Sequence, residues 1–113
     1  MNRFKGRLDE NSGVTLLKFS YNGKEFKIRT TDHESYDHLN RKYDLNVVCG
    51  DIVALGKARL YNYADKGDDI AIIDRDNDIT TIITFEETQI RIRTVIDKSN
   101  VWVKKGTRIF NLK

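Results

Sequence analysis

The 113-residue sequence has no proline, a single cysteine and no long hydrophobic run. Cys49 alone cannot form an internal disulfide, which favours a reducing, cytoplasmic location, and we interpret it as a buried apolar residue, not a nucleophile. No apolar stretch approaches the roughly 18–20 residues of a membrane-spanning helix, and residues 1–8 lack the apolar core of a signal peptide, so we expect no membrane partner. The lack of proline beside many Lys, Asp, Asn and Ile residues indicates an AT-rich bacterial or phage gene. A phage product would act in the host cytoplasm.

Motifs that would specify a reaction are also missing. No glycine-rich phosphate loop follows a strand, and no serine lies in a strained strand-to-helix turn of the hydrolase type. Asp74, Asp76 and Asp78 resemble the start of a calcium-binding loop, but Ile79 and Phe85 occupy the positions that require Gly and Glu. A hairpin turn with solvated carboxylates is the better interpretation, and we expect no metal site and no cofactor.

What is present describes one small, basic, highly charged domain. Hydrophobic residues make up 39% of the chain and charged residues 33%, which suffices for one core, so residues 1–113 are expected to form a single domain. The net charge of +3 is unevenly distributed: residues 63–78 are acidic, whereas residues 88–113 hold seven basic residues against Asp97 alone. A basic segment of this kind can attract phosphate backbones, or it can be an ordinary solvated sheet face.

Residues 14–30 carry the clearest structural pattern, two strand-like runs separated by Asn22 and Gly23. Asn-Gly tolerates the positive φ angles of a type I′ turn, whose twist matches that of the flanking strands. The turn also fixes the register of the hairpin. The facing pairs on one side are then Phe19 with Phe26 and Leu17 with Ile28, and the other side carries Lys18, Lys27 and Arg29. Residues 1–8 are compatible with a further strand.

A short helix is predicted over residues 32–44. Thr31 or Asp32 can cap its N-terminus, because both side chains can accept a hydrogen bond from a backbone N–H in the first turn. Apolar residues then recur at helical spacing, so that one stripe of the helix is expected to pack inward. This stripe consists of Tyr36, Leu39 and Tyr43.

A neighbouring face of the same helix carries His33, Asp37 and Arg41, which recur every four residues. His33 suits proton transfer near neutral pH, Asp37 can orient it, and Arg41 can hold a phosphate through two hydrogen bonds. Metal-free RNA cleavage needs such groups, although Asp37 and Arg41 are equally well explained as a routine surface ion pair. His38 lies about 140° around the helix from His33, so the two cannot chelate one metal ion.

The remaining chain is predicted to be mostly sheet. Residues 45–63 fit either a strand or a second short helix, which we favour. Residues 69–74, 78–85, 88–97 and 101–112 are rich in β-branched and aromatic residues and predict an antiparallel meander. The expected fold class is therefore α+β, with an N-terminal β-hairpin, one or two short helices and a C-terminal antiparallel sheet.

One aromatic residue in the basic segment has a possible role in binding. Trp102 can stack on a nucleobase while Lys104 and Lys105 bind phosphate. A core or partner-facing position explains Trp102 as well.

The stretch TDHESYDHLNR, residues 31–41, resembles the helix of small toxin-type ribonucleases of the RelE/BrnT kind and of related phage early endoribonucleases. That helix reads roughly T/S-x-H-x-x-x-R-x-x-x-R. Thr31, His33 and Arg41 match the pattern, whereas Asp37 stands in place of its middle arginine. The likeness covers about residues 30–85 and implies an α+β domain that cuts or binds RNA, with His33 and Arg41 as catalytic residues. The phosphate contacts that it implies are Arg91, Arg93, Lys104 and Arg108.

The expected function is that of a small cytoplasmic domain that interacts with RNA or another nucleic acid, in its strongest form a metal-independent endoribonuclease of toxin type. Two alternatives stay open. One is a partly open five-stranded barrel that binds oligonucleotides without chemistry, which a strand over residues 45–63 would favour. The other is a phage-type accessory protein that binds and modulates a host protein or nucleotide, and a protein partner would require an exposed apolar patch.

Overall fold

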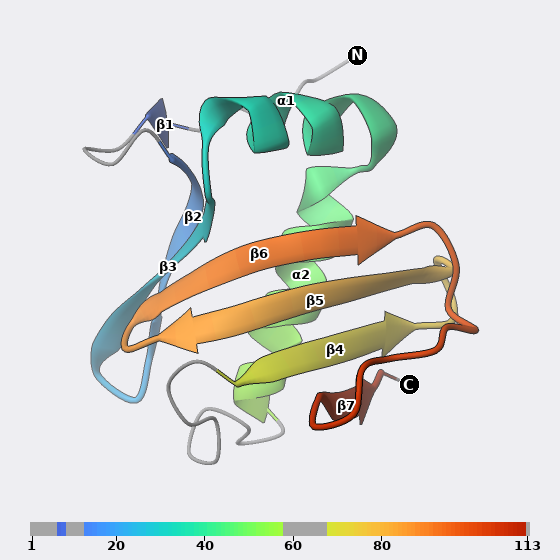
Figure 1. The fold of residues 1–113 in the computed structure, drawn as a ribbon. Coiled ribbons are helices and arrows are strands. Elements are labelled where there is room, and N and C mark those ends of the chain that lie inside the picture. The colour runs from blue at the N-terminus through green and yellow to red at the C-terminus, as the bar shows by residue number, and fades with distance from the viewer. Residues whose placement is uncertain (1–6, 9–12, 58–67, 113) are drawn as a thin grey trace.

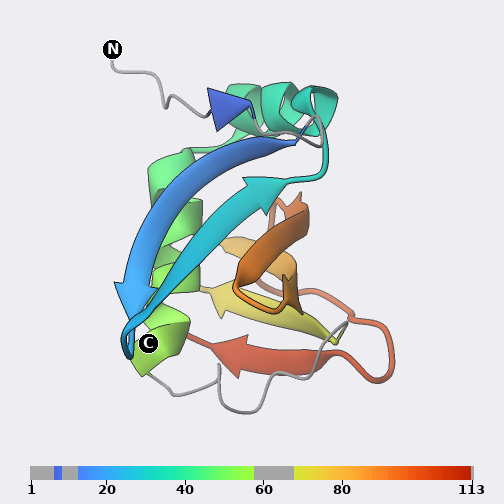
Figure 2. The same ribbon diagram turned by 90° about the vertical axis from the view of Figure 1, so that its left-hand side faces the viewer.

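The computed structural model describes residues 7–8, 13–57 and 68–112. They form two helices packed on one curved, mixed sheet (Figures 1 and 2), so the α+β fold class is confirmed. The sheet has the strand order β1-β2-β3-β6-β5-β4-β7. In chain order the elements are β1 (Arg7–Leu8), β2 (Val14–Tyr21), β3 (Lys24–Thr30), α1 (His33–Lys42), α2 (Leu45–Lys57), β4 (Asp69–Asp74), β5 (Ile79–Glu86), β6 (Gln89–Ile96) and β7 (Arg108–Asn111).

β2 and β3 form the predicted hairpin in the predicted register. Asn22 and Gly23 have φ angles of 52° and 76°, as a type I′ turn requires. A β-bulge at Leu16, which the sequence pattern did not predict, turns this extra residue into the core. Both predicted facing pairs are present, Phe19 with Phe26 and Leu17 with Ile28. Of the further strand considered for residues 1–8, Arg7–Leu8 pair with β2, and the rest lies outside the described residues.

β4, β5 and β6 form the predicted antiparallel meander. The turn between β4 and β5 is the hairpin turn expected for the aspartate-rich stretch. The Asp74 carboxylate accepts hydrogen bonds from the backbone N–H and the side-chain amide of Asn77. Asp78, with φ at 54°, accepts hydrogen bonds from the backbone N–H and the hydroxyl of Ser99, both at 2.8 Å. These two carboxylates therefore hold turns in place.

The prediction of a final strand over residues 101–112 is wrong in extent and in pairing. Only Arg108–Asn111 form a strand, and β7 pairs in parallel with β4. The free edge of β6, which a meander would use, is occupied by β3, because these two strands pair in parallel. The chain therefore crosses to the far edge of the sheet, and the sheet is mixed instead of wholly antiparallel.

α1 begins after Asp32, whose carboxylate accepts a hydrogen bond from the backbone N–H of Ser35 at 2.7 Å. At the other end of the helix, the Tyr43 hydroxyl donates a hydrogen bond to the Val95 carbonyl at 3.0 Å, which ties α1 to β6. The predicted apolar stripe packs inward, with Leu39 buried and Tyr36 and Tyr43 half-buried against the core.

α2 fills the angle where the sheet bends between β3 and β6 (Figures 1 and 2), and it contacts both β2 and β4. Val48, Ile52 and Leu55 are fully buried at helical spacing. Their burial outweighs the helix penalty of Gly50 and Gly56, about 1 kcal/mol each. The helical interpretation of residues 45–57 is confirmed and the strand alternative is wrong for them, whereas residues 58–63 lie outside the described part of the chain.

Candidate nucleic-acid interface

The outer face of the sheet gathers cations that are distant in the sequence. Side chains of a strand point alternately to the two faces, and the apolar residues of β3 and β6 are buried on the side of α2. The residues between them therefore point outward. We name the resulting set the basic face, and it consists of Lys18 on β2, Lys27 and Arg29 on β3, and Arg91 and Arg93 on β6.

Like charges lie directly opposite one another on this basic face. The register pairs Lys18 with Lys27 across β2 and β3, and Arg29 with Arg91 across β3 and β6. Like charges in facing positions destabilise a sheet. Folding stability alone therefore does not explain why these cations face one another. A bound polyanion would offset their mutual repulsion, because its negative charges attract both members of each pair.

Neighbouring polar side chains hold the two central arginines of the basic face. Arg29 Nη1 donates a hydrogen bond to Gln89 Oε1 at 3.1 Å, and Arg91 Nε lies 3.2 Å from Glu86 Oε1. Glu86 is half exposed, so its ion pair with Arg91 is screened by water. Strand alternation also places Glu25 of β3 on this face, so its five basic side chains stand against the carboxylates of Glu25 and Glu86. Of the predicted phosphate contacts, Arg91 and Arg93 therefore lie together on it.

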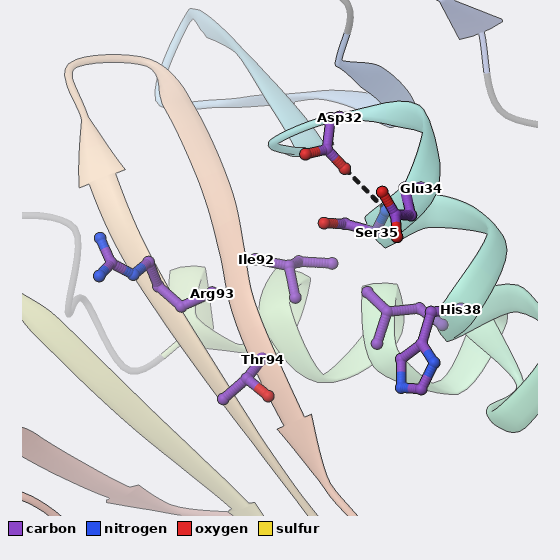
Figure 3. Close-up of a pocket in the computed structure, with 8 residues that line it drawn as sticks. Asp32, Glu34, Ser35, His38, Ile92, Arg93 and Thr94 are labelled. Carbon is purple, nitrogen blue, oxygen red and sulfur yellow. Dashed lines mark hydrogen bonds between the residues drawn. The ribbon is translucent and has the colours of Figure 1, made fainter.

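A hollow of about 350 Å³ opens between α1 and β6 (Figure 3), where β3 has turned away from β6 toward α1. Arg93 lines the hollow and also belongs to the basic face, so the two sites adjoin. In Figure 3, Ile92 and Arg93 extend to opposite sides of β6. The lining residues are Asp32, Glu34, Ser35, His38, Leu39, Ile92, Arg93 and Thr94.

Glu34 and His38 are the two residues of this hollow whose side chains can exchange protons with a ligand. They lie one helical turn apart on α1, both are exposed, and both line the hollow. A carboxylate and an imidazole that face one hollow can accept and donate protons on the same substrate. Asp32 is committed to the helix cap instead, because its hydrogen bond from the Ser35 backbone lowers the pKa of Asp32 and keeps it ionised.

The structure places His33 and Arg41 elsewhere on α1. His33 is exposed, and its Nδ1 lies 3.3 Å from Asp37 Oδ2, as the four-residue spacing predicted. Arg41 is exposed in the last turn of the helix. Neither residue is among those that line the hollow, so the structure does not bring them together with Arg93.

The other predicted contacts lie in the connection from β6 to β7 and on β7 itself, at the far edge of the sheet. Trp102 is 93% exposed, which contradicts a core position. Lys104 and Lys105 are exposed in a turn. Arg108, on β7, has its Nη2 3.5 Å from Asp68 Oδ2. These four predicted residues are therefore separate from the basic face.

Sequence reasoning missed the Glu34–His38 pair and the basic face as a unit. The pair had a signal, since the two residues stand four apart on a predicted helix. The basic face had none, because the β3–β6 pairing joins Arg29 to Gln89, 60 positions away along the chain.

Three ionisable side chains outside the hollow are buried, namely those of Cys49, Asp51 and Asp74. Burial raises the pKa of the Cys49 thiol to about 12, so Cys49 is the inert apolar residue predicted. Asp51 on α2 and Asp74 at the end of β4 share a hydrogen bond, and burial together with Asp74 raises the pKa of Asp51 to about 8. Burial acts to raise the pKa of Asp74 as well, but hydrogen bonds from Asp51 and Asn77 outweigh it and leave that pKa lowered. The described residues contain no group of three or more His, Cys, Asp or Glu side chains that could hold a metal ion.

Comparison of the chain with protein-family models, with curated proteins and with solved structures found no match. Within the described residues, neither helix has the length and apolar character needed to cross a membrane. The function is therefore argued from the basic face and the hollow.

Proposed function

We propose that the protein is a metal-independent endoribonuclease that binds RNA on the basic face and cleaves it in the adjoining hollow. The observation that carries this proposal is that basic residues face one another across three neighbouring strands. The facing pairs are Lys18 with Lys27 and Arg29 with Arg91. A phosphate backbone neutralises such rows and releases its own counterions. The hollow beside them supplies proton-transfer groups, which a purely binding surface would not need.

Glu34 acts as the general base and His38 as the general acid. The Glu34 carboxylate takes the proton of a ribose 2′-hydroxyl, and the 2′-oxygen attacks the adjacent phosphorus. The His38 imidazolium gives a proton to the departing 5′-oxygen, so the products carry a 2′,3′-cyclic phosphate and a 5′-hydroxyl. The exposed guanidinium of Arg93 extends to the opposite side of β6 from Ile92 (Figure 3), so it binds a flanking phosphate on the basic face at the edge of the hollow.

The hollow does not attract RNA by itself, because the carboxylates of Asp32 and Glu34 line it and the Arg93 side chain extends to the other side of β6 (Figure 3). Affinity has to come from the basic face next to it. Binding that depends on several phosphate contacts weakens steeply as salt is added. The proposal therefore requires salt-dependent binding as well as cleavage.

Three further observations support an RNA-cutting domain over the alternatives. Two helices and an antiparallel sheet agree with the α+β domain that the resemblance to RelE/BrnT-type ribonucleases implied. α2 occupies residues that the oligonucleotide-binding barrel would need as strand. Within the described part of the chain, the large hydrophobic side chains that are exposed are Trp102 and Ile109, which is little apolar surface for an accessory protein that binds a host protein.

The test is RNA binding and cleavage in EDTA, with lysine variants of the basic face. The double variant Lys18→Ala/Lys27→Ala should lower the slope of log affinity against log salt by about 2, one for each lost phosphate contact. Lys24→Ala is the matched control, because strand alternation places this exposed lysine of β3 on the opposite face. Wild-type products should carry cyclic phosphate ends. Equal salt slopes for Lys24→Ala and the double variant would contradict the basic face, and cleavage only after Mg²⁺ is added would contradict the metal-independent mechanism.

A further inference from the structure

The Trp102 side chain is exposed to solvent. It lies in the connection that runs from the end of β6 to β7 at the far edge of the sheet (Figure 1). Burial alternates there: Val101 and Val103 are half-buried, whereas Trp102 between them is 93% exposed. Exposure therefore alternates along this segment, and the indole is on the side that faces solvent.

The indole also has no partner among the residues that the structure describes. Among the described residues, Trp102 has neither a hydrogen bond nor a ring contact. Tryptophan side chains are normally well buried, because their large apolar surface favours removal from water. A fully presented indole therefore offers a flat apolar surface to a ligand.

Two unpaired cations follow directly. Lys104 and Lys105 are exposed, and neither forms an ion pair with another described residue. A tight turn holds them: the Thr107 N–H donates to the Lys104 carbonyl at 3.0 Å, and Gly106 has φ at +94°, which side-chain-bearing residues rarely adopt. Lys104 and Lys105 follow Trp102 by two and three positions in the chain, and this turn fixes their backbone.

We propose that Trp102, Lys104 and Lys105 form a second RNA contact, in which a nucleobase stacks on the indole and the flanking phosphates bind the two lysines. Stacked bases are available only in single strands, so the ligand is single-stranded RNA. An acidic protein segment would satisfy the lysines too, but a tryptophan that anchors a protein interface is surrounded by other contacts that exclude water. Among the described residues, the other large hydrophobic side chain that is exposed is Ile109 on β7, at 54%. Trp102 and Ile109 alone do not supply the surrounding contacts of a protein interface. This inference rests on the proposed function, since it extends the same RNA strand beyond the basic face.

Trp102 is the only tryptophan in the chain, so its fluorescence reports on this contact alone. The probe is a non-cleavable single-stranded oligonucleotide of about 12 nucleotides with 2′-O-methyl groups, and the same sequence as a duplex serves for comparison. The single strand should quench the Trp102 fluorescence over the concentration range in which it binds the protein. The duplex should cause no quenching. Trp102→Ala should weaken single-strand binding by about 5- to 100-fold, and Trp102→Phe by less, because a smaller ring still stacks.

Ile109→Ala is the matched control, because it removes another exposed hydrophobic side chain of the same edge and should leave affinity unchanged. If the wild type binds and cleaves RNA but neither quenching nor a loss in Trp102→Ala is seen, the stacking contact is overturned and the proposed function stands. If quenching occurs while the wild type does not cleave and Lys18→Ala/Lys27→Ala binds normally, the proposed function is overturned and the stacking contact stands. Quenching by a poly-glutamate peptide and not by RNA would overturn the inference in favour of a protein ligand.

Discussion

Asp51 and Asp74 form a contact that ordinary packing does not favour. Their side chains are 9% and 5% exposed, they share a hydrogen bond, and Asp51 Oδ2 is buried without a hydrogen-bond partner. Ionising both of two such close carboxylates in a poorly hydrated site is unfavourable, because the two negative charges repel each other and are weakly solvated. The pair therefore holds one proton, on Asp51, whose pKa is the one that is raised.

This proton makes stability depend on pH in a defined direction. In the unfolded chain an aspartate releases its proton near pH 4, whereas Asp51 in the folded protein keeps it to about pH 8. Between these values the folded state binds more protons, so the free energy of unfolding should fall as pH rises, by up to about 1.4 kcal/mol per pH unit from this group. The lowered pKa of Asp74 acts in the opposite direction, but only below this window.

Asp51→Asn should remove that contribution, because an amide can donate to the Asp74 carboxylate as the protonated carboxyl does. Urea unfolding at several pH values between 5 and 8 measures it, and the variant should overtake the wild type toward pH 8. Other titrating groups are common to both proteins and cancel in the difference. Parallel curves for the two proteins would show that Asp51 is already ionised at pH 5.

Two glycines should respond in opposite ways to the same substitution. Gly23 has φ at +76° in the hairpin turn, and an alanine there should cost about 1–2 kcal/mol of stability, because residues with a side chain are strained in the left-handed region. Gly50 lies in α2 with open space around its Cβ position, and an alanine there should stabilise by about 0.5–1 kcal/mol. Chemical denaturation of the two variants measures both effects. Destabilisation by Gly50→Ala would mean that α2 needs the glycine.

At the scale of elements, local chemistry was sufficient to predict the hairpin and α1, and it favoured a helix over residues 45–63 without excluding a strand. Asn22 and Gly23 set the register of β2 and β3, and the spacing of Val48, Ile52 and Leu55 set α2. The final strand failed because its partner is chosen by the rest of the sheet. β7 could be placed only after β3 was known to occupy the edge of β6, and that pairing has no local signal.

The hairpin register has a direct consequence for stability. Phe26 is 6% exposed on the face that the register assigned to the core, and it stacks on Phe19 with 5.7 Å between ring centroids. Phe26→Ala should therefore cost about 3–5 kcal/mol, and Phe19→Ala, at a half-buried position, should cost less. Thermal or urea unfolding of the two variants measures both losses of stability. A loss below about 0.5 kcal/mol for Phe26→Ala would mean that the ring does not contribute to the core.

At the scale of the whole molecule, the sequence indicated that the C-terminal third is basic but not where its charges gather. Arg91 and Arg93 join Lys18, Lys27 and Arg29 because the parallel β3–β6 pair brings the two halves of the chain together. The candidate catalytic residues depended on the same pairing. His33 was the natural choice from a helix viewed alone, whereas the hollow against β6 selects the face that carries His38.

If RNA is cleaved in the hollow between α1 and β6, the two histidines of α1 should contribute very differently to the cleavage rate. Both side chains are exposed, so His38→Ala and His33→Ala should both stay folded. In EDTA, His38→Ala should lose about 10²- to 10⁴-fold of the wild-type cleavage rate, as expected for a general acid, and His33→Ala should keep most of it. Loss of cleavage in His33→Ala with normal activity in His38→Ala would contradict the account and move the chemistry to the His33–Asp37 face, and a wild type that leaves RNA intact would contradict the ribonuclease itself.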